Sequence, residues 1–187
     1  MTDAPAAGNA PDSKAAGHLF ALARPMQHAL NNLFMVLQAN LDSVLASLPP
    51  EDRAAVRLQR ASQGAKDMEA LLRAYLRIGR PAEQSPLDSG KFLDAVRPVL
   101  AQAAGKPLPV EKRATATIVP PRPAVDVALI DLAFCARALP TGVKPALVLD
   151  GATLIANWAA SEAVVESLEA LGLSVARGEE ETRVTLV

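Results

Sequence analysis

Two apolar stripes with helical spacing dominate the first half of this 187-residue chain. Their members recur every three or four residues, which is typical of helices that pack along one face. Between the stripes, "LPPED" ends one helix at Pro49 and Pro50 and places acidic residues at the start of the next. The sequence therefore predicts a helical hairpin over residues 18–80. The stripes are Met26, Leu30, Leu33, Leu37, Leu41, Val44 and Leu48, then Leu58, Ala61, Ala65, Met68, Leu72 and Tyr75.

One hairpin can bury only part of two such stripes against itself. A second hairpin would complete a four-helix bundle, so we expect a homodimer. The alternative is a bundle that the C-terminal half of the same chain completes.

The pattern changes after the hairpin. Residues 81–90 are rich in Pro, Ser and Gly and predict a linker, and residues 91–187 predict a small α/β domain. In that domain we expect one sheet with helices on one face. The expected helices cover 90–105, 124–139 and 161–172, the expected strand lies in 108–121, and two β-hairpins turn at Asp150-Gly151 and at "RGEEE". The predicted fold class is α+β.

Composition narrows the functional classes. A formal net charge of -1 argues against a nucleic-acid-binding protein, because such proteins carry a clustered basic surplus. The single cysteine, Cys135, excludes an intramolecular disulfide and a Cys-based zinc site. Residues 1–17 contain several Pro and Gly residues, lack the pattern of a signal peptide and are predicted to be disordered. No apolar run approaches the length of a membrane span, so we expect a cytoplasmic protein without a membrane partner.

The stretch "QHALNNLFMVLQANL" carries a histidine next to the first apolar stripe. At about 100° per residue, His28 lies roughly 140–180° from Leu30, Leu33 and Leu37 and so faces away from the stripe. An exposed imidazole can act as a nucleophile. By geometry alone, a surface histidine without a role is the alternative, and His18 is assigned to that class. The polar and apolar residues within about 60° of His28 include Arg24, Asn31, Asn32 and Met35.

"HALNNLFMVLQANLDSVL" resembles the phosphoacceptor box of histidine kinases, in the variant His-Asp-Phe-Asn-Asn-Leu-Leu. "VDVALIDLAFCARALPTG" looks like the N-box helix of the kinase ATPase domain. The layout is also similar to bacterial histidine phosphotransferases, which are dimeric helical hairpins with a degenerate ATPase-like domain. The resemblance implies that His28 accepts a phosphoryl group. Asn32 matches the position where phosphatase-active members hold a water, and Asn31 is the third candidate site residue.

Departures from the family pattern change the expected chemistry. Cys135 occupies the place of the N-box asparagine, and a soft thiol does not suit Mg²⁺. Neither an Asp-x-Gly-x-Gly adenine site nor a Gly-rich lid is present, so we expect no ATP binding and no autokinase activity. The residue after the histidine, usually an acid, is Ala29. We expect the protein to need no cofactor of its own, because a partner receiver domain supplies Mg²⁺.

The resulting hypothesis is a histidine phosphotransferase that relays a phosphoryl group through His28 between receiver-domain aspartates. The expected partners are a second copy, response-regulator receiver domains and a hybrid histidine kinase. Two alternatives remain: a non-catalytic dimeric pseudokinase adaptor, which Ala29 favours, and a receiver phosphatase that uses Asn32. Cationic flanks of the second helix could steer an acidic receiver. The expected partner-binding residues are Arg24, Met35, Arg57 and Arg60.

Overall fold

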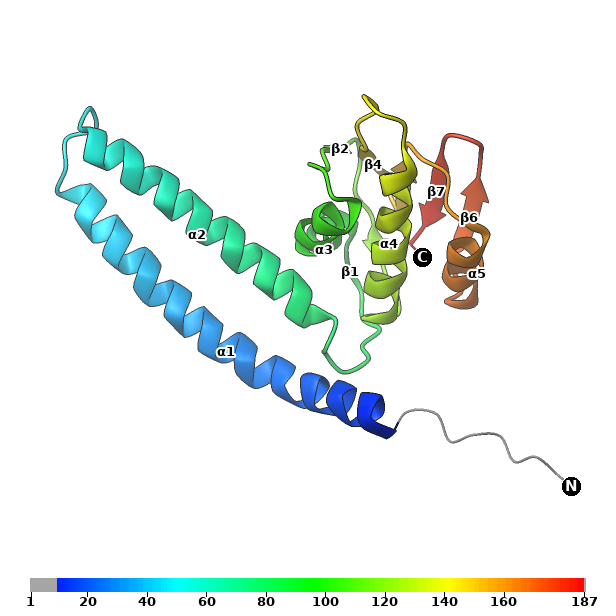
Figure 1. The fold of residues 1–187 in the computed structure, drawn as a ribbon. Helices are drawn as coiled ribbons and strands as arrows, with labels where there is room; N and C mark the ends of the chain where they lie inside the picture. The colour runs from blue at the N-terminus through cyan, green and yellow to red at the C-terminus, as the bar shows by residue number, and fades with distance from the viewer. Residues whose placement is uncertain (1–9, 187) are drawn as a thin grey trace, which may run out of the picture.

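The computed structural model describes residues 10–186, and its fold is α+β. A hairpin of two long helices, α1 (Ala10–Ala46) and α2 (Arg53–Arg77), projects from a C-terminal domain of a sheet and three helices (Figure 1). Asp52 caps α2 by accepting a hydrogen bond from the Ala54 backbone N–H at 2.7 Å. None of the described helices combines the length and apolar character that crossing a bilayer requires.

The segment predicted to be disordered, residues 1–17, overlaps the start of α1. Residues 10–17 form the first turns of α1, whereas residues 1–9 lie outside the described residues. The segment is rich in Ala, and a proline near a helix start costs little because its missing N–H would have no partner there.

The two helices of the hairpin pack through a narrow line of small and apolar side chains. Ala23 and Phe34 of α1 and Ala55 and Ala65 of α2 are buried in this contact. Midway along it, the Ser62 hydroxyl donates to Gln38 Oε1 at 3.1 Å. Phe34 and Ser62 are absent from the predicted stripes, so each helix packs on its neighbour through a face rotated from its stripe.

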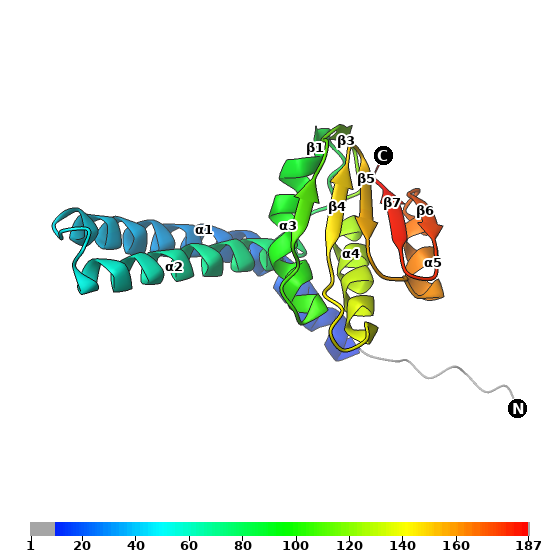
Figure 2. The ribbon, with the colours of Figure 1, turned by 90° about the horizontal axis from the view of Figure 1, so that it is seen from above.

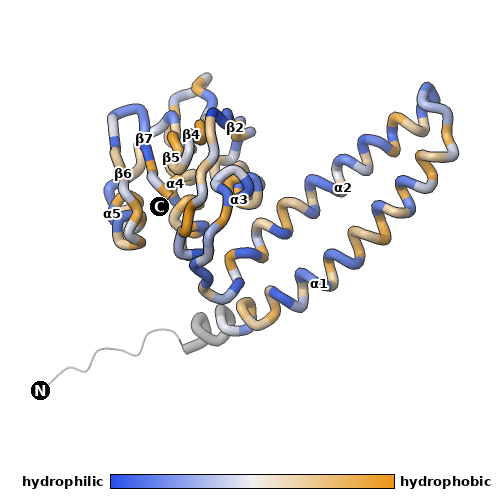
Figure 3. Tube along the Cα trace, turned by 180° about the vertical axis from the view of Figure 1, so that it is seen from behind, coloured by the Kyte–Doolittle hydropathy of each residue, from blue (hydrophilic) through white to orange (hydrophobic). Residues whose placement is uncertain are grey.

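Much of each predicted stripe remains exposed as a result. Viewed down each helix from its N-terminus, the exposed stripe is rotated by about 80–90° from the residues that face the other helix. The direction of this rotation is the same in both helices. Because the helices are antiparallel, both exposed stripes lie on the same side of the hairpin. We call this side the apolar face; it consists of Met26, Leu33, Leu37 and Val44 of α1 with Ala61, Met68 and Tyr75 of α2. Figure 3 shows apolar residues recurring along both helices.

The C-terminal domain is built on a five-stranded mixed sheet with strand order β2-β4-β5-β7-β6. Only the β2–β4 pair is parallel, and the other pairs are antiparallel. Helices cover one face of the sheet, as Figure 2 shows for α4 and α5. The hydrophobic core lies between the sheet and these helices. The strands are β2 (Val110–Lys112), β4 (Leu147–Asp150), β5 (Thr153–Ala156), β6 (Ser174–Arg177) and β7 (Thr182–Thr185), and the helices are α3 (Ser89–Ala104), α4 (Ala124–Cys135) and α5 (Glu162–Ala170).

Two expectations for this domain need correction. The predicted strand in 108–121 is two short strands, β2 and β3 (Thr117–Ile118), and β3 pairs with β1 (Leu87–Asp88) in a separate two-stranded sheet. Between β2 and β3, the Ser89 N–H donates to the Ala116 carbonyl and the Ala116 N–H donates to the Ser89 hydroxyl. The first β-hairpin turns at Gly151-Ala152 rather than Asp150-Gly151, since Asp150 still pairs with Thr153.

The predicted linker, residues 81–90, is held against the domain. Its last residues belong to β1 and to the start of α3. Glu83 and Arg122 exchange two backbone hydrogen bonds at 2.8 and 2.9 Å, and the Arg122 guanidinium donates to the Ser85 hydroxyl at 2.7 Å. The connection between hairpin and domain is therefore short and hydrogen-bonded to the domain through Arg122.

Candidate functional site

His28 lies on the exposed surface of α1, on the side of the hairpin away from the apolar face. Arg24 and Asn32, each one turn away, are also exposed, and the Met35 side chain stands 66% exposed two turns along. Helical rotation places His28 about 160° from the apolar stripe of α1. A partner can thus reach the imidazole while the apolar face is covered.

Asn31 differs from its neighbour Asn32. It is half-buried in a small hollow between α1 and α2, which Phe34, Glu69 and Arg73 also line. Its Oδ1 atom is buried without a hydrogen-bond partner. Asn31 therefore points toward α2, and of the two asparagines only Asn32 shares the open surface of His28.

A cleft of about 440 Å³ opens beside His28. Its floor is α2, one wall is Gln27 of α1, the residue before His28, and the other wall is α3. Four of its lining residues are cations and one, Asp94, is an acid. We call it the basic cleft; its lining residues are Gln27, Ala70, Arg73, Arg77, Arg80, Lys91, Asp94, Ala95 and Pro98.

The cations of the basic cleft differ in how far they are already neutralised. Arg73 forms an i,i+4 ion pair with Glu69 on the surface of α2. Arg80 donates to the uncharged Gln27 Oε1 at 2.7 Å, so its charge stays available. Lys91 lies in the first turn of α3 at the opposite wall. Since Asp94 is already bound by Lys112 at 2.6 Å, the cleft presents a positive field to an approaching acidic surface.

Arg57 and Arg60, which the sequence suggested as partner-binding residues, lie elsewhere. The Gln38–Ser62 contact fixes the register of the hairpin, and in that register both arginines lie opposite residues at least twelve positions beyond His28. At 1.5 Å per residue they are about 18 Å or more from His28 along the helix axis. The structure brings Arg24, Met35 and Asn32 together with His28 but not these two arginines.

A second cleft, of about 560 Å³, lies beside the end of α4. Cys135 and Asn157 line it together with Glu179 and Glu180 of the β6–β7 turn, and none of the described lining residues is Lys, Arg or His. The Trp158 indole is 2% exposed and donates from Nε1 to the Leu132 carbonyl of α4 at 2.9 Å. The charged side chains that line this cleft are the carboxylates of Glu179 and Glu180.

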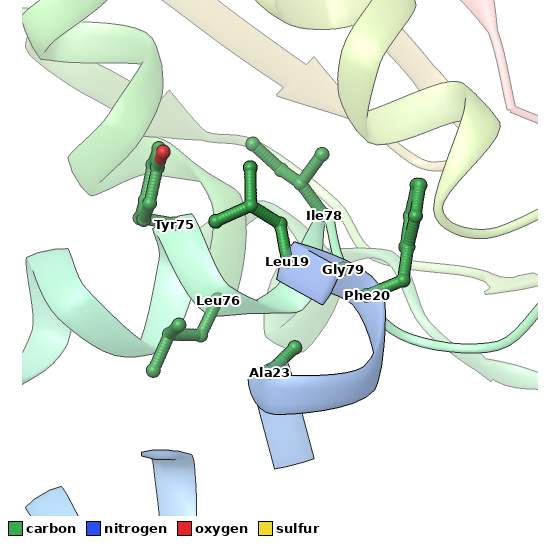
Figure 4. Close-up of a pocket in the computed structure, with 7 residues that line it drawn as sticks. All are labelled: Leu19, Phe20, Ala23, Tyr75, Leu76, Ile78 and Gly79. Atoms are coloured by element: carbon green, nitrogen blue, oxygen red, sulfur yellow. The ribbon is translucent and has the colours of Figure 1, made fainter. Parts of the chain in front are cut away.

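An apolar hollow of about 260 Å³ lies at the base of the hairpin (Figure 4). Leu19 and Phe20 of α1 meet Tyr75 and Ile78 at the end of α2, with Gly79 beside them. Tyr75 belongs to the apolar face as well, so the hollow continues that face toward the base of the hairpin.

Sequence patterns located the histidine but not the second wall of the basic cleft. The arginines at 73, 77 and 80 stand out as a flank of α2, whereas Lys91 is an ordinary surface lysine in a helix start. Only the packing of α2 on α3 brings it into the cleft with them. Comparison of the sequence with protein-family models and with curated proteins found no match.

Proposed function

We propose that this protein is a histidine phosphotransferase of a two-component phosphorelay, and that it passes a phosphoryl group through His28 between receiver-domain aspartates. The observation that carries the proposal is the position of His28. It is exposed on the side of the hairpin away from the apolar face, and its neighbour Gln27 lines a cleft that holds four cations. A receiver domain presents an aspartyl phosphate within an acidic pocket, and this surface complements it.

The proposed transfer requires little of this chain beyond an accessible nucleophile. One imidazole nitrogen of His28 attacks phosphorus, a P–N bond forms, the P–O bond to the aspartyl carboxylate breaks, and the imidazole loses its N–H proton to solvent. The receiver carboxylate departs with the electron pair of the broken bond. The reverse sequence on a second receiver completes the relay. Mg²⁺ would come from the receiver, and the cations of the basic cleft would orient the complex.

We also propose that a second copy covers the apolar face and completes a four-helix bundle. Two hairpins related by a twofold axis would bury the same stripes on both copies, as an isologous interface requires. The two exposed stripes lie side by side, as a partner hairpin in a four-helix bundle requires. The C-terminal domain of the same chain does not cover them. His28 would stay accessible on both copies because it faces the other way.

The proposal includes no use of ATP. Glu179 and Glu180 line the cleft at Cys135. In the sequence resemblance to histidine kinases, Cys135 takes the place of the N-box asparagine that would hold Mg²⁺. Phosphoryl transfer from ATP depends on cations that neutralise the charge of the transferring group. These residues support a protein that obtains phosphate from a receiver rather than from a nucleotide.

The test is transfer from a receiver domain carrying a labelled aspartyl phosphate. We expect an acid-labile label on this chain that His28→Ala abolishes, and Arg57→Ala serves as a control for loss of a distant cation. Two other outcomes would replace the proposal. Loss of receiver phosphate that needs Asn32 but not His28 indicates a phosphatase, and binding that leaves the receiver phosphate intact indicates a pseudokinase adaptor.

A further inference from the structure

We infer that Arg77 of α2 and Asp126 of α4 brace the C-terminal domain against the hairpin, and that this pair positions the α3 wall of the basic cleft relative to His28. The bracing is a property of the fold alone. Its effect on transfer rests on the function proposed above. Histidine and receiver would then meet at a cleft of fixed width rather than between two loosely connected domains.

The pair joins residues 49 positions apart through two hydrogen bonds. Arg77 Nε donates to Asp126 Oδ2 at 2.7 Å, and Arg77 Nη2 donates to Asp126 Oδ1 at 3.3 Å. The Asp126 side chain is 2% exposed and that of Arg77 is 11% exposed, so water screens the pair little. A two-pronged contact of this kind fixes orientation as well as distance.

Arg77 also contacts the third helix of the junction. Its guanidinium carbon lies 5.2 Å from the centre of the Phe92 ring, and Phe92 is a fully buried residue of α3. One side chain of α2 thereby touches both α3 and α4. Arg77 lines the basic cleft as well, so the contacts of this side chain lie between the α2 floor and the α3 wall of that cleft.

Within the described part of the chain, the Asp126 carboxylate accepts side-chain hydrogen bonds from Arg77 alone. Burial raises the pKa of its carboxyl group, and the charges of Arg77, Arg122 and Arg80 oppose that rise. A buried carboxylate at the start of a core helix is costly unless a cation meets it. Here the cation comes from the hairpin, which is the arrangement expected if the pair exists to hold the two parts together.

The first test measures the distance between the two parts. Spin labels are attached at Ser43→Cys near the hairpin tip and Ser167→Cys on α5, both exposed, in a Cys135→Ala background. Labelled protein is mixed with a large excess of unlabelled protein, so that only distances within one chain are measured. We expect a narrow distance distribution that broadens in Asp126→Asn. Glu181→Gln removes a partner from the exposed Arg183–Glu181 pair and should leave the distribution narrow.

A distance distribution that is as narrow in Asp126→Asn as in the wild-type protein would overturn the inference. If Asp126→Asn does not fold, as judged by circular dichroism and melting, Arg77→Lys takes its place. That variant keeps the charge but cannot make the two-pronged contact. A narrow distribution in Arg77→Lys would likewise contradict the brace.

The second test measures transfer from a phosphorylated receiver with the same variants. We expect Asp126→Asn to raise KM for the receiver about tenfold and to change kcat less than about twofold, because the variant disturbs docking and leaves His28 intact. An unchanged KM would refute the positioning role even if the distance distribution broadens. Absence of label on the wild-type chain would instead refute the proposed function, and the distance measurement would still decide the brace.

Discussion

Replacement of Leu33 by Ala tests whether the apolar face of the hairpin is a dimer interface. Leu33 is the most exposed large apolar side chain of that face, at 67% exposure. Complete burial of a leucine side chain contributes about 1.5–3 kcal/mol. Since two thirds of this side chain remains accessible in one copy, burial against a second copy would contribute about 1–2 kcal/mol.

A twofold dimer buries Leu33 of both copies, so the effect doubles. The free energy of dimerisation should weaken by about 2–4 kcal/mol, which corresponds to a dissociation constant about 30- to 1,000-fold higher. Sedimentation over a concentration series measures this constant directly. We expect the wild-type protein to sediment as a dimer and Leu33→Ala to dissociate at concentrations where the wild type does not.

Met35→Ala is the matched control. Met35 is 66% exposed and two residues away, but it lies on the opposite side of α1, about 200° around the helix. It should leave the dissociation constant unchanged. Equal weakening by both variants would refute the assignment of the interface to the apolar face, and a monomeric wild-type protein at the highest concentration would refute the dimer itself.

Three further predictions concern stability and ligands. A Cβ atom at Gly79 would lie 2.7 Å from the Ala23 Cβ atom, so Gly79→Ala should lower the free energy of unfolding by about 1–3 kcal/mol in denaturant titration, and Ala23→Gly in the same chain should restore part of it. Asp88 is the N-cap of α3, and hydrogen bonds from the Lys91 backbone N–H and Thr115 lower the pKa of its carboxyl group. The ionised carboxylate therefore stabilises the folded protein above the unfolded-state pKa, and this stabilisation is lost as pH falls through the folded-state pKa. Asp88→Ala should lower the melting temperature at neutral pH and remove that acid dependence. ATP with Mg²⁺ should not raise the melting temperature, and a rise of several degrees would contradict our interpretation of the cleft at Cys135.

Helix and strand positions followed from local signals, which is why most of them could be predicted. Pro49 and Pro50 end α1, Ser161 caps α5, and Gly172 has the positive φ of 80° expected just past that helix. These features depend on residues close in sequence. The α+β class followed because a helical period of three and four residues gives way to short alternating segments at the linker.

The pairing faces could not be predicted in the same way. An apolar stripe marks a helix face that avoids water, but it does not say which neighbour covers it. Within one chain, α1 and α2 pack through Ala23, Ala65 and Ser62, whose small side chains let the helices approach closely. Several larger stripe residues, among them Leu33, Met68 and Tyr75, stay exposed outside this contact. The same reasoning explains why the sequence predicted one strand where the structure has β2 and β3. The two strands differ only in their partners, because β2 pairs with β4 and β3 pairs with β1.

Under the proposed function, the absence of an acid beside His28 bears on the kind of phosphate donor that could serve the relay. Ala29 is exposed and offers no group to accept the imidazole proton. A donor with a poor leaving group would need such help together with bound Mg²⁺ and cations at the phosphates. An aspartyl phosphate is an acyl phosphate, and its leaving group is a weakly basic carboxylate that departs readily. The chain then has to supply an open nucleophile and correct docking, which are the two features that His28 and the basic cleft provide. This is why the loss of the acid and the loss of the nucleotide ligands belong together in our proposal.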